Sequence, residues 1–422
     1  MREMKDSGIE WVGAIPQDWQ LSKIGSLYTQ RNEKVSDKNY QPLSVTMQGI
    51  LPQLATAAKT DDGDNRKLVR VGDFAINSRS DRRGSCGISP LDGSVSLINI
   101  ILTPRTAMHP GYYNWLFHTT LFADEFYKWG HGIVADLWTT RWQEMKSITV
   151  PVPEYAEQER IAAFLDAECA EIDTVLEKTR ASIEEYKKLK QAVITQAVTK
   201  GIRGDRPMKD SGIEWIGDIP AEWDVVRIKN LFDYRNERNF KPLEEVNLIS
   251  LYTDKGVVQH CDLDETTGNK ASNADGYKLV YENDIVVNII LCWMGAIGRS
   301  AYFGVTSPAY DVYSPKQKTN SKFYHYLFRT NGFSGDCYKV GRGIMAMRWR
   351  TYSDQFRAIK VVSPPQSEQE EIVEYLDEKC EGIDDLIAKK QQYLTEIENY
   401  KKSLIYEYVT GKKEVKTSVL AD

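Results

Sequence analysis

The sequence predicts an α+β protein with two pseudo-twofold-related mixed α/β domains, separated by an antiparallel coiled coil of two long helices. Three observations predict this fold: an opening segment that occurs twice, a repeat that continues along the chain, and two long stretches of heptad periodicity. At 422 residues the chain is also too long for one compact core. We therefore expect each half of the chain to be a domain followed by a helix.

The opening segment MKDSGIEWVGAIPQDW (4–19) returns as MKDSGIEWIGDIPAEW (208–223), with twelve of sixteen positions identical. Further matches follow at an offset of 204 residues, which becomes 211 from the middle of each copy onward. A period near 207 residues is too long for a solenoid repeat, so it indicates a duplicated domain. We expect the tryptophans of both copies to anchor this segment on a neighbouring helix end: Trp11, Trp19, Trp215 and Trp223.

Each domain interior shows the same order of patterns. Strand-like runs occupy 73–78 and 284–293. Aromatic, helix-like stretches follow, and a proline pair then closes each domain. The aromatic stretches lie at 112–117 and 323–328, and the proline pairs at 151–153 and 363–366. The predicted domains are therefore 1–153 and 202–365.

Beyond each proline pair the apolar period becomes helical, which predicts long helices over 154–201 and 366–413 and a tail over 414–422. Each helix would be about 65–70 Å long at 1.5 Å per residue. Because neither helix can bury its apolar stripe alone, we expect the two stripes to pair. The predicted pairing residues are Ile172, Leu176, Ile183, Tyr186, Val193, Ile383, Ile387, Leu394, Ile397 and Leu404.

Polar residues interrupt this stripe at Thr179, Lys190, Lys390 and Lys401. Two interpretations stay open: they specify the helix register, or their amines reach solvent from a loosely packed helix end. Cys169 and Cys380 fall at matching places in the stripe, and we expect them to be small buried hydrophobic residues.

Several functional classes find no support in the sequence. No apolar run is long enough to span a membrane, and the N-terminus does not resemble a signal peptide, so we expect a cytoplasmic protein. The cysteines form no C-x-x-C pair and the histidines show no metal spacing, so no metal site is expected. No phosphate-binding G-x-x-x-x-G-K-[ST] motif and no catalytic group is identified. The pattern favours a binding protein over an enzyme.

The net charge of −6 would argue against a nucleic-acid partner if it were spread evenly. Residues 154–200 hold 10 acidic and 7 basic residues, and residues 366–413 hold 12 acidic and 7 basic residues. The acidity therefore lies in the two predicted helices, and the rest of the chain carries +2. A mildly basic remainder is compatible with binding DNA.

Basic residues among glycines and aromatic residues mark candidate DNA-binding loops in both domains. These loops differ in sequence between the copies, which suits the reading of two different half-sites. The candidates are Gln48, Arg79, Arg82, Arg83, His131 and Arg141 in the first domain, and Lys255, Arg299, Lys339, Arg342, Arg348 and Arg350 in the second.

With its duplicated SGIEW-[VI]-G-x-IP-x-x-W segment and its EQERIAAFLD and EQEEIVEYLD helix starts, the chain resembles the specificity subunit of a bacterial type I restriction–modification enzyme. The resemblance covers essentially the whole chain. It implies two target-recognition domains that each read one half of a bipartite DNA site, with the helix length setting the spacer. The family's modification subunits dock on the helices and methylate adenine N6, and its restriction subunits translocate and cleave DNA. S-adenosylmethionine, ATP and Mg would then belong to those partners, and no cofactor to this chain.

Two alternatives remain at this stage. A methyltransferase–specificity fusion would need a cofactor loop and an N/D-P-P-Y/F motif, which the sequence lacks. A coiled-coil adaptor that never touches DNA would also satisfy the helix pattern.

Overall fold

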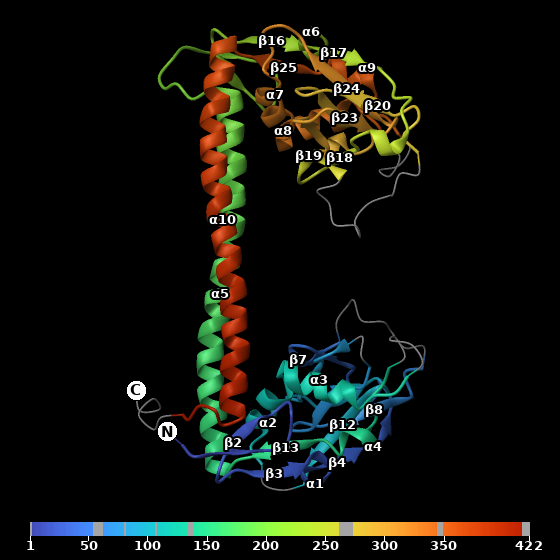
Figure 1. The fold of residues 1–422 in the computed structure, drawn as a ribbon, viewed down its shortest axis with the longest axis vertical. Helices are drawn as coiled ribbons and strands as arrows, with labels where there is room; N and C mark the ends of the chain where they lie inside the picture. Colours follow the sequence, from blue (N-terminus) through green and yellow to red (C-terminus); the bar gives the residue numbers. More distant parts are fainter. Residues whose placement is uncertain are drawn as a thin grey trace. The chain divides into compact units, whose positions relative to one another are not determined.

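The computed structural model describes residues 2–53, 62–79, 82–105, 108–132, 138–260, 273–343 and 349–415. They form two compact units, Met1–Arg180 with Gln391–Asp422 (unit 1) and Ala181–Lys390 (unit 2). Each unit contains one globular head and part of both long helices. We call β1 through β13, with their short helices, the first head, and β14 through β25 the second head (Figure 1).

The first head contains thirteen short strands among the described residues. They are β1 (Met4–Asp6), β2 (Ala14–Pro16), β3 (Gln20–Lys23), β4 (Tyr28–Arg31), β5 (Lys34–Val35), β6 (Leu43–Thr46), β7 (Gly49–Pro52), β8 (Arg66–Val69), β9 (Phe74–Asn77), β10 (Cys86–Ile88), β11 (Gly93–Val95), β12 (Asn99–Pro104) and β13 (Thr149–Val152). Its helices are α1 (Ile24–Leu27), α2 (Pro110–Phe117), α3 (Thr120–Lys128) and α4 (Trp142–Met145).

The second head repeats this order. Its strands are β14 (Met208–Asp210), β15 (Asp218–Pro220), β16 (Asp224–Arg227), β17 (Phe232–Arg235), β18 (Ile249–Tyr252), β19 (Gly256–Gln259), β20 (Lys278–Val280), β21 (Ile285–Asn288), β22 (Ile297–Arg299), β23 (Gly304–Thr306), β24 (Tyr310–Pro315) and β25 (Lys360–Ser363). Its helices are α6 (Ile228–Leu231), η3 (Leu243–Glu245), η5 (Cys292–Met294), α7 (Ser321–Phe328), α8 (Asn331–Val340) and α9 (Ser353–Ala358).

The largest sheets of the two heads have the same topology, whereas the three-stranded sheet β11-β8-β5 of the first head corresponds to the two-stranded sheet β23-β20 of the second. The largest sheet runs β10-β9-β12-β4 in the first head and β22-β21-β24-β17 in the second, and its strands are antiparallel. The pairing registers also correspond: Ile100 lies opposite Ile76 and Asp311 opposite Val287, each pair 211 residues from its equivalent. The duplication seen in the sequence is therefore a duplication of the fold.

The long helices are α5 (Tyr155–Lys200) and α10 (Gln366–Val409). In unit 1, Asp173 of α5 pairs with Lys401 of α10, and Arg180 of α5 pairs with Glu398 of α10. The residue numbers rise along α5 as they fall along α10, so the two helices are antiparallel. In unit 2, Tyr186 lies under Lys390 and Lys190 pairs with Asp384, which gives the same antiparallel direction. The predicted α+β class, with duplicated mixed heads and paired long helices, is confirmed.

The opening segment of each head is fixed to the first turn of a long helix. The Trp19 indole N–H donates to Glu157 of α5 at 2.9 Å, and the Trp223 indole N–H donates to Glu368 of α10 at 2.8 Å. Both tryptophans are buried, and both glutamates are buried. The repeated tryptophan therefore anchors the chain, as expected, and the shared EQ pair that begins each long helix has a structural role.

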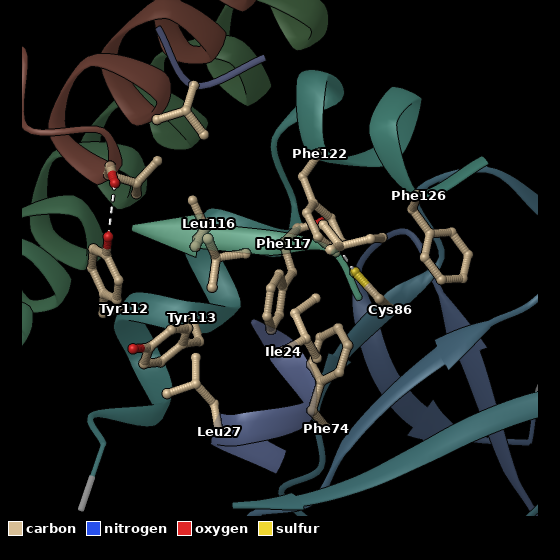
Figure 2. Packing of buried hydrophobic residues seen from close by; sticks show 14 of the residues in the cluster. Ile24, Leu27, Phe74, Cys86, Tyr112, Tyr113, Leu116, Phe117, Phe122 and Phe126 are labelled. Atoms are coloured by element: carbon tan, nitrogen blue, oxygen red, sulfur yellow. Dashed lines mark hydrogen bonds between the residues drawn. The ribbon is translucent and has the colours of Figure 1, made fainter. Parts of the chain in front are cut away.

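An aromatic cluster fills the first head between its main sheet and its helices (Figure 2). Phe117 of α2 lies 4.7 Å from Phe74 of β9 and 4.6 Å from Phe122 of α3, measured between ring centroids. The Tyr112 hydroxyl donates to the carbonyl of Val409 at 2.8 Å, so the cluster also holds the end of α10 (Figure 2). Burying such rings contributes a large share of a core's stability.

One predicted element is wrong in its extent. The apolar run 284–293 was expected to be a single strand, but β21 ends at Asn288 and η5 occupies the last part of the run. The Asn288 side chain accepts hydrogen bonds from the backbone N–H groups of Ile290 and Leu291, which turns the chain out of the sheet.

Candidate nucleic-acid interface

A loop with the same base follows α3 in the first head and α8 in the second. In the first head, His131 and Thr139 exchange two backbone hydrogen bonds of 3.0 Å. In the second, Arg342 and Arg350 exchange backbone hydrogen bonds of 2.8 and 2.9 Å. The backbone thus joins the two ends of each loop, and it places one predicted residue, His131, at the first loop base and two, Arg342 and Arg350, at the second.

A tryptophan side chain packs at the base of each loop and donates a hydrogen bond to a backbone carbonyl. Trp138 donates its indole N–H to the carbonyl of Tyr127 at 2.7 Å, and Trp349 donates to the carbonyl of Tyr338 at 3.1 Å. A β-carbon at Gly130 would clash with the Trp138 ring, and one at Gly341 would clash with the Trp349 ring. This close approach explains the first glycine of the sequence pattern K-x-G-x-G-I, which occurs at 128–133 and again at 339–344.

Three candidates of the first head gather around one strand edge. Arg79 forms a β-bridge with Thr139, which is also bridged to His131, and Arg141 follows two residues later. The side chains of Arg79, His131 and Arg141 are exposed. His131 also lies 4.0 Å from the carboxylate of Glu144.

The other candidates of the first head lie elsewhere. Arg83 pairs with Asp124 of α3 and lies over the Tyr127 ring, so its charge is partly neutralised. Arg82 is exposed beside it, and Gln48 is exposed at the turn between β6 and β7. The structure does not bring Gln48 into the Arg79 group through any contact between described residues.

The second head brings together fewer of its candidates. Arg342 and Arg350 lie opposite each other at the loop base, whereas Arg348 falls outside the described residues. Lys339 pairs with Glu214 of the opening segment at 3.0 Å. Arg299 donates to Asn283 at 2.8 Å on the edge strand β22. Lys255 is exposed at the turn between β18 and β19.

Sequence reasoning missed an aromatic stack beside the second loop. Tyr338 lies 5.6 Å from Trp293 and 5.0 Å from Trp349, measured between ring centroids, and it is half exposed. The position equivalent to Trp293 in the first head is Arg82, 211 residues earlier, so this stack is specific to the second head. The exposed rings offer a face on which a base can stack.

The sequence RNE occurs at 31–33 and again at 235–237, and its arginine is not part of the interface. Arg31 donates to Asp73 at 2.7 and 3.1 Å, and Arg235 donates to Asp284 at 2.9 and 3.3 Å. Both aspartates are buried. Burial raises the pKa of Asp284, although its hydrogen bonds and Arg235 oppose that rise. These pairs hold the first strand of the main sheet to the turn before β9 and β21.

The ten predicted pairing residues of the long helices are all buried or half-buried. Two of the three lysines of the stripe reach acids on the facing helix: Lys190 binds Asp384 at 2.5 Å and Lys401 binds Asp173 at 2.6 Å, whereas Lys390 lies over the Tyr186 ring. Thr179 bonds to the carbonyl of Val175 in its own helix. The amines are thus directed to specific partners at the solvent edge of the helix pair.

No cluster of metal-binding side chains occurs among the described residues. In the same part of the chain, no helix is both long and apolar enough to cross a membrane.

Comparison with known proteins places this fold. Residues 220–398 match the family model described as type I restriction modification DNA specificity domain. Two relatives from Methanocaldococcus jannaschii match nearly the whole chain, each at 24% identity. One is a putative type I restriction enzyme MjaX specificity subunit, with 96% of each chain covered, and the other is the MjaVIII specificity subunit, with 95% of this chain and 94% of the relative covered.

Together these matches indicate a specificity subunit of a type I restriction–modification system. These subunits are non-catalytic. Two solved structures share the fold. A chain from a study of assembly and conformational transition in a type I R-M system gives a TM-score of 0.70 at 13% identity, covering 94% of this chain and 99% of that one. The HsdS subunit from Thermoanaerobacter tengcongensis gives 0.51 at 16% identity, with 94% and 98% covered.

Proposed function

We propose that this specificity subunit reads a bipartite DNA site, one half with each head, for a type I restriction–modification complex. The observation that carries the proposal is the duplicated head, in which the same loop base presents different side chains. His131 stands at this base in the first head and Arg342 in the second. Two heads with the same loop backbone but different side chains at the loop base suit the recognition of two half-sites that differ in sequence.

The long helices would set the spacer between the half-sites and dock the methyltransferase subunits. At 1.5 Å per residue, the 46 and 44 residues of α5 and α10 correspond to about 66–69 Å of helix. Their exposed faces carry the excess of acidic residues, which suits a protein partner better than DNA.

Adenine-N6 methylation, translocation and cleavage would belong to the modification and restriction subunits, in the cytoplasm. S-adenosylmethionine, ATP and Mg would be bound by those subunits and not by this chain. Base extrusion for methylation would likewise occur in the modification subunit.

Genome-wide mapping of adenine methylation in a host that expresses the complex tests the proposal. We expect one bipartite motif that disappears when this chain is omitted. Deleting one heptad from both α5 and α10 should shorten the spacer and keep both half-sites. An unchanged motif would contradict the role of the helices.

A second variant tests the assignment of the heads. We expect Arg350→Ala to weaken recognition of only the half-site read by the second head, with His131→Ala as the matched change in the first head. Arg348→Ala carries the same expectation from the sequence. Equal loss on all DNA sequences would reassign these residues to phosphate contact.

A further inference from the structure

The first head has a basic cleft beside its loop base. Its volume is about 340 Å³, and it lies where β9 ends, β12 begins and α4 starts. The lining residues are Gln30, Lys67, Ser78, Arg79, Leu97, Ile98, Ile100, Thr139, Arg141 and Trp142. Three of these ten are cations, and none of the described lining residues is acidic.

The three cations are not neutralised within the described part of the chain. Lys67 is half-buried and donates to the carbonyl of Asn99 at 2.7 Å. Burial lowers the pKa of its ammonium group, as expected for a charge held without a counter-ion. Arg79 and Arg141 are exposed, and no carboxylate of a described residue forms an ion pair with either guanidinium or with Lys67.

In the second head, the lysine equivalent to Lys67 is buried and paired with an acidic residue. Lys278, 211 residues after Lys67, is only 3% exposed. Its ammonium donates to Asp311 at 2.9 Å and to the Tyr234 hydroxyl at 3.1 Å. Asp311 takes the place of Ile100 in the equivalent strand pairing.

The remaining cations of the cleft also lack basic equivalents. At the positions of Arg79 and Arg141, the second head has Ile290 and Tyr352. Tyr352 precedes α9 as Arg141 precedes α4, so the two positions correspond in the fold as well. At the position of Thr139 the second head has Arg350, so its lining positions carry Lys278 and Arg350 against Asp311, a net charge of +1, where the first head carries +3.

We propose that this cleft of the first head binds one backbone phosphate of the DNA strand that the head reads, and that the second head lacks an equivalent site. The proposal rests on the proposed function. Two arginines, with forked guanidinium groups, and one lysine line a single cleft, and together they offer enough donors for the several oxygens of a phosphate. Such a contact positions a reading head on the duplex and carries no sequence information itself.

The test measures DNA binding by the full chain over a series of salt concentrations. For labelled duplex DNA, the wild-type chain should give a linear fall of log K with log salt. Lys67→Met and Arg141→Gln should each weaken binding on every sequence. Each should also make the slope shallower, by about 0.9 if that variant loses the phosphate contact.

Two further variants use the second head as the reference. Ile100→Asp introduces into the first head the aspartate that the second head has at the equivalent position, next to Lys67. We expect this variant to make the slope of log K against log salt shallower, as the loss of a cation does. Lys278→Met removes the lysine that is already paired and should leave the slope unchanged. Arg141→Lys keeps the charge and should retain most of the slope, and thermal unfolding of each variant reports whether it folds.

The outcomes separate this inference from the proposed function. If the wild-type chain binds DNA and the folded cleft variants keep its slope, the cleft assignment is overturned and the reading function stands. If inorganic phosphate binds at the cleft but DNA neither competes with it nor depends on the three cations, the site serves a free phosphate and the inference is also overturned. If the chain, with or without modification subunits, binds no DNA, the proposed function itself fails.

Discussion

The two heads of this subunit share the contacts that hold their frames and differ in single side chains at equivalent positions. The Asn114 side chain accepts a hydrogen bond from the backbone of Ile88, and His325 accepts the equivalent bond from Arg299. Ile100 in the first head corresponds to Asp311 in the second. The comparison teaches that the same backbone accepts side chains of different charge and pKa at equivalent positions. The condition is that each hydrogen bond that holds the backbone keeps a donor and an acceptor.

The largest effect should come from the frame itself. Arg235→Ala leaves the buried carboxylate of Asp284 without its cation, and Arg31→Ala does the same to Asp73. We expect each change to lower the free energy of unfolding of its own unit by about 3–5 kcal/mol. Hydrogen exchange of peptides from each unit of the full chain measures this, and each unit serves as the control for the other.

Acid should partly rescue Arg235→Ala. The pKa of Asp284 in the folded protein is raised by burial, so the folded state binds a proton more readily than the unfolded state. Stability from this group therefore rises as the pH falls through the raised pKa toward 3.8, the ordinary value. If the difference in unfolding free energy between Arg235→Ala and the wild type stayed constant over this pH range, another partner would be holding Asp284 in its charged form.

A somewhat smaller effect should follow from making the second head resemble the first. Asp311→Ile leaves the buried ammonium of Lys278 with only the Tyr234 hydroxyl. We expect a loss of about 3 kcal/mol in the unfolding free energy of unit 2. The double variant with Lys278→Met should recover most of it, because the uncompensated charge is then gone. Chemical denaturation of the full chain, with exchange in unit 1 as the reference, checks both.

The next comparison concerns pH. Burial, together with the positive charges of Arg329, Arg299 and Lys322, lowers the pKa of His325 to about 3. The unfolded chain, with a histidine pKa near 6.5, binds a proton first as the pH falls. Stability from neutral His325 is therefore present above pH 6.5 and lost between 6.5 and 3, at no more than about 1.4 kcal/mol per pH unit.

His325→Asn tests this directly, since Asn114 fills the same place in the first head. We expect unit 2 of the variant to lose less stability between pH 6.5 and 5 than unit 2 of the wild type. Hydrogen exchange corrected for intrinsic rates at each pH provides the measurement. An identical decline in both proteins would show that His325 already carries a proton in the folded state.

Much of the frame could be predicted because it was repeated. The duplicated Trp19 and Trp223 and the EQ helix starts occur twice at one spacing, which is a pattern that one sequence displays without homologues. The cleft could not be predicted in the same way. Lys67 and Lys278 are the same residue at equivalent positions, and only the structure shows that Lys67 lines the cleft with Ile100 whereas Lys278 pairs with Asp311. The DNA-binding candidates remain predictions, because exposure and loop geometry do not identify a base contact.

The smallest effect should come from the lysines of the helix stripe. Lys190 and Lys401 bind Asp384 and Asp173, and both aspartates are more than half exposed. Exposed ion pairs of this kind contribute about 0.2–1 kcal/mol, so Lys190→Met should change the stability of unit 2 by less than 1 kcal/mol, and Lys401→Met that of unit 1. If the lysines instead specify register, exchange protection should spread to new positions along α5 and α10 in the double variant. Protection that keeps its wild-type pattern at 1 M salt, where the pairs are screened, would assign register to the apolar residues alone.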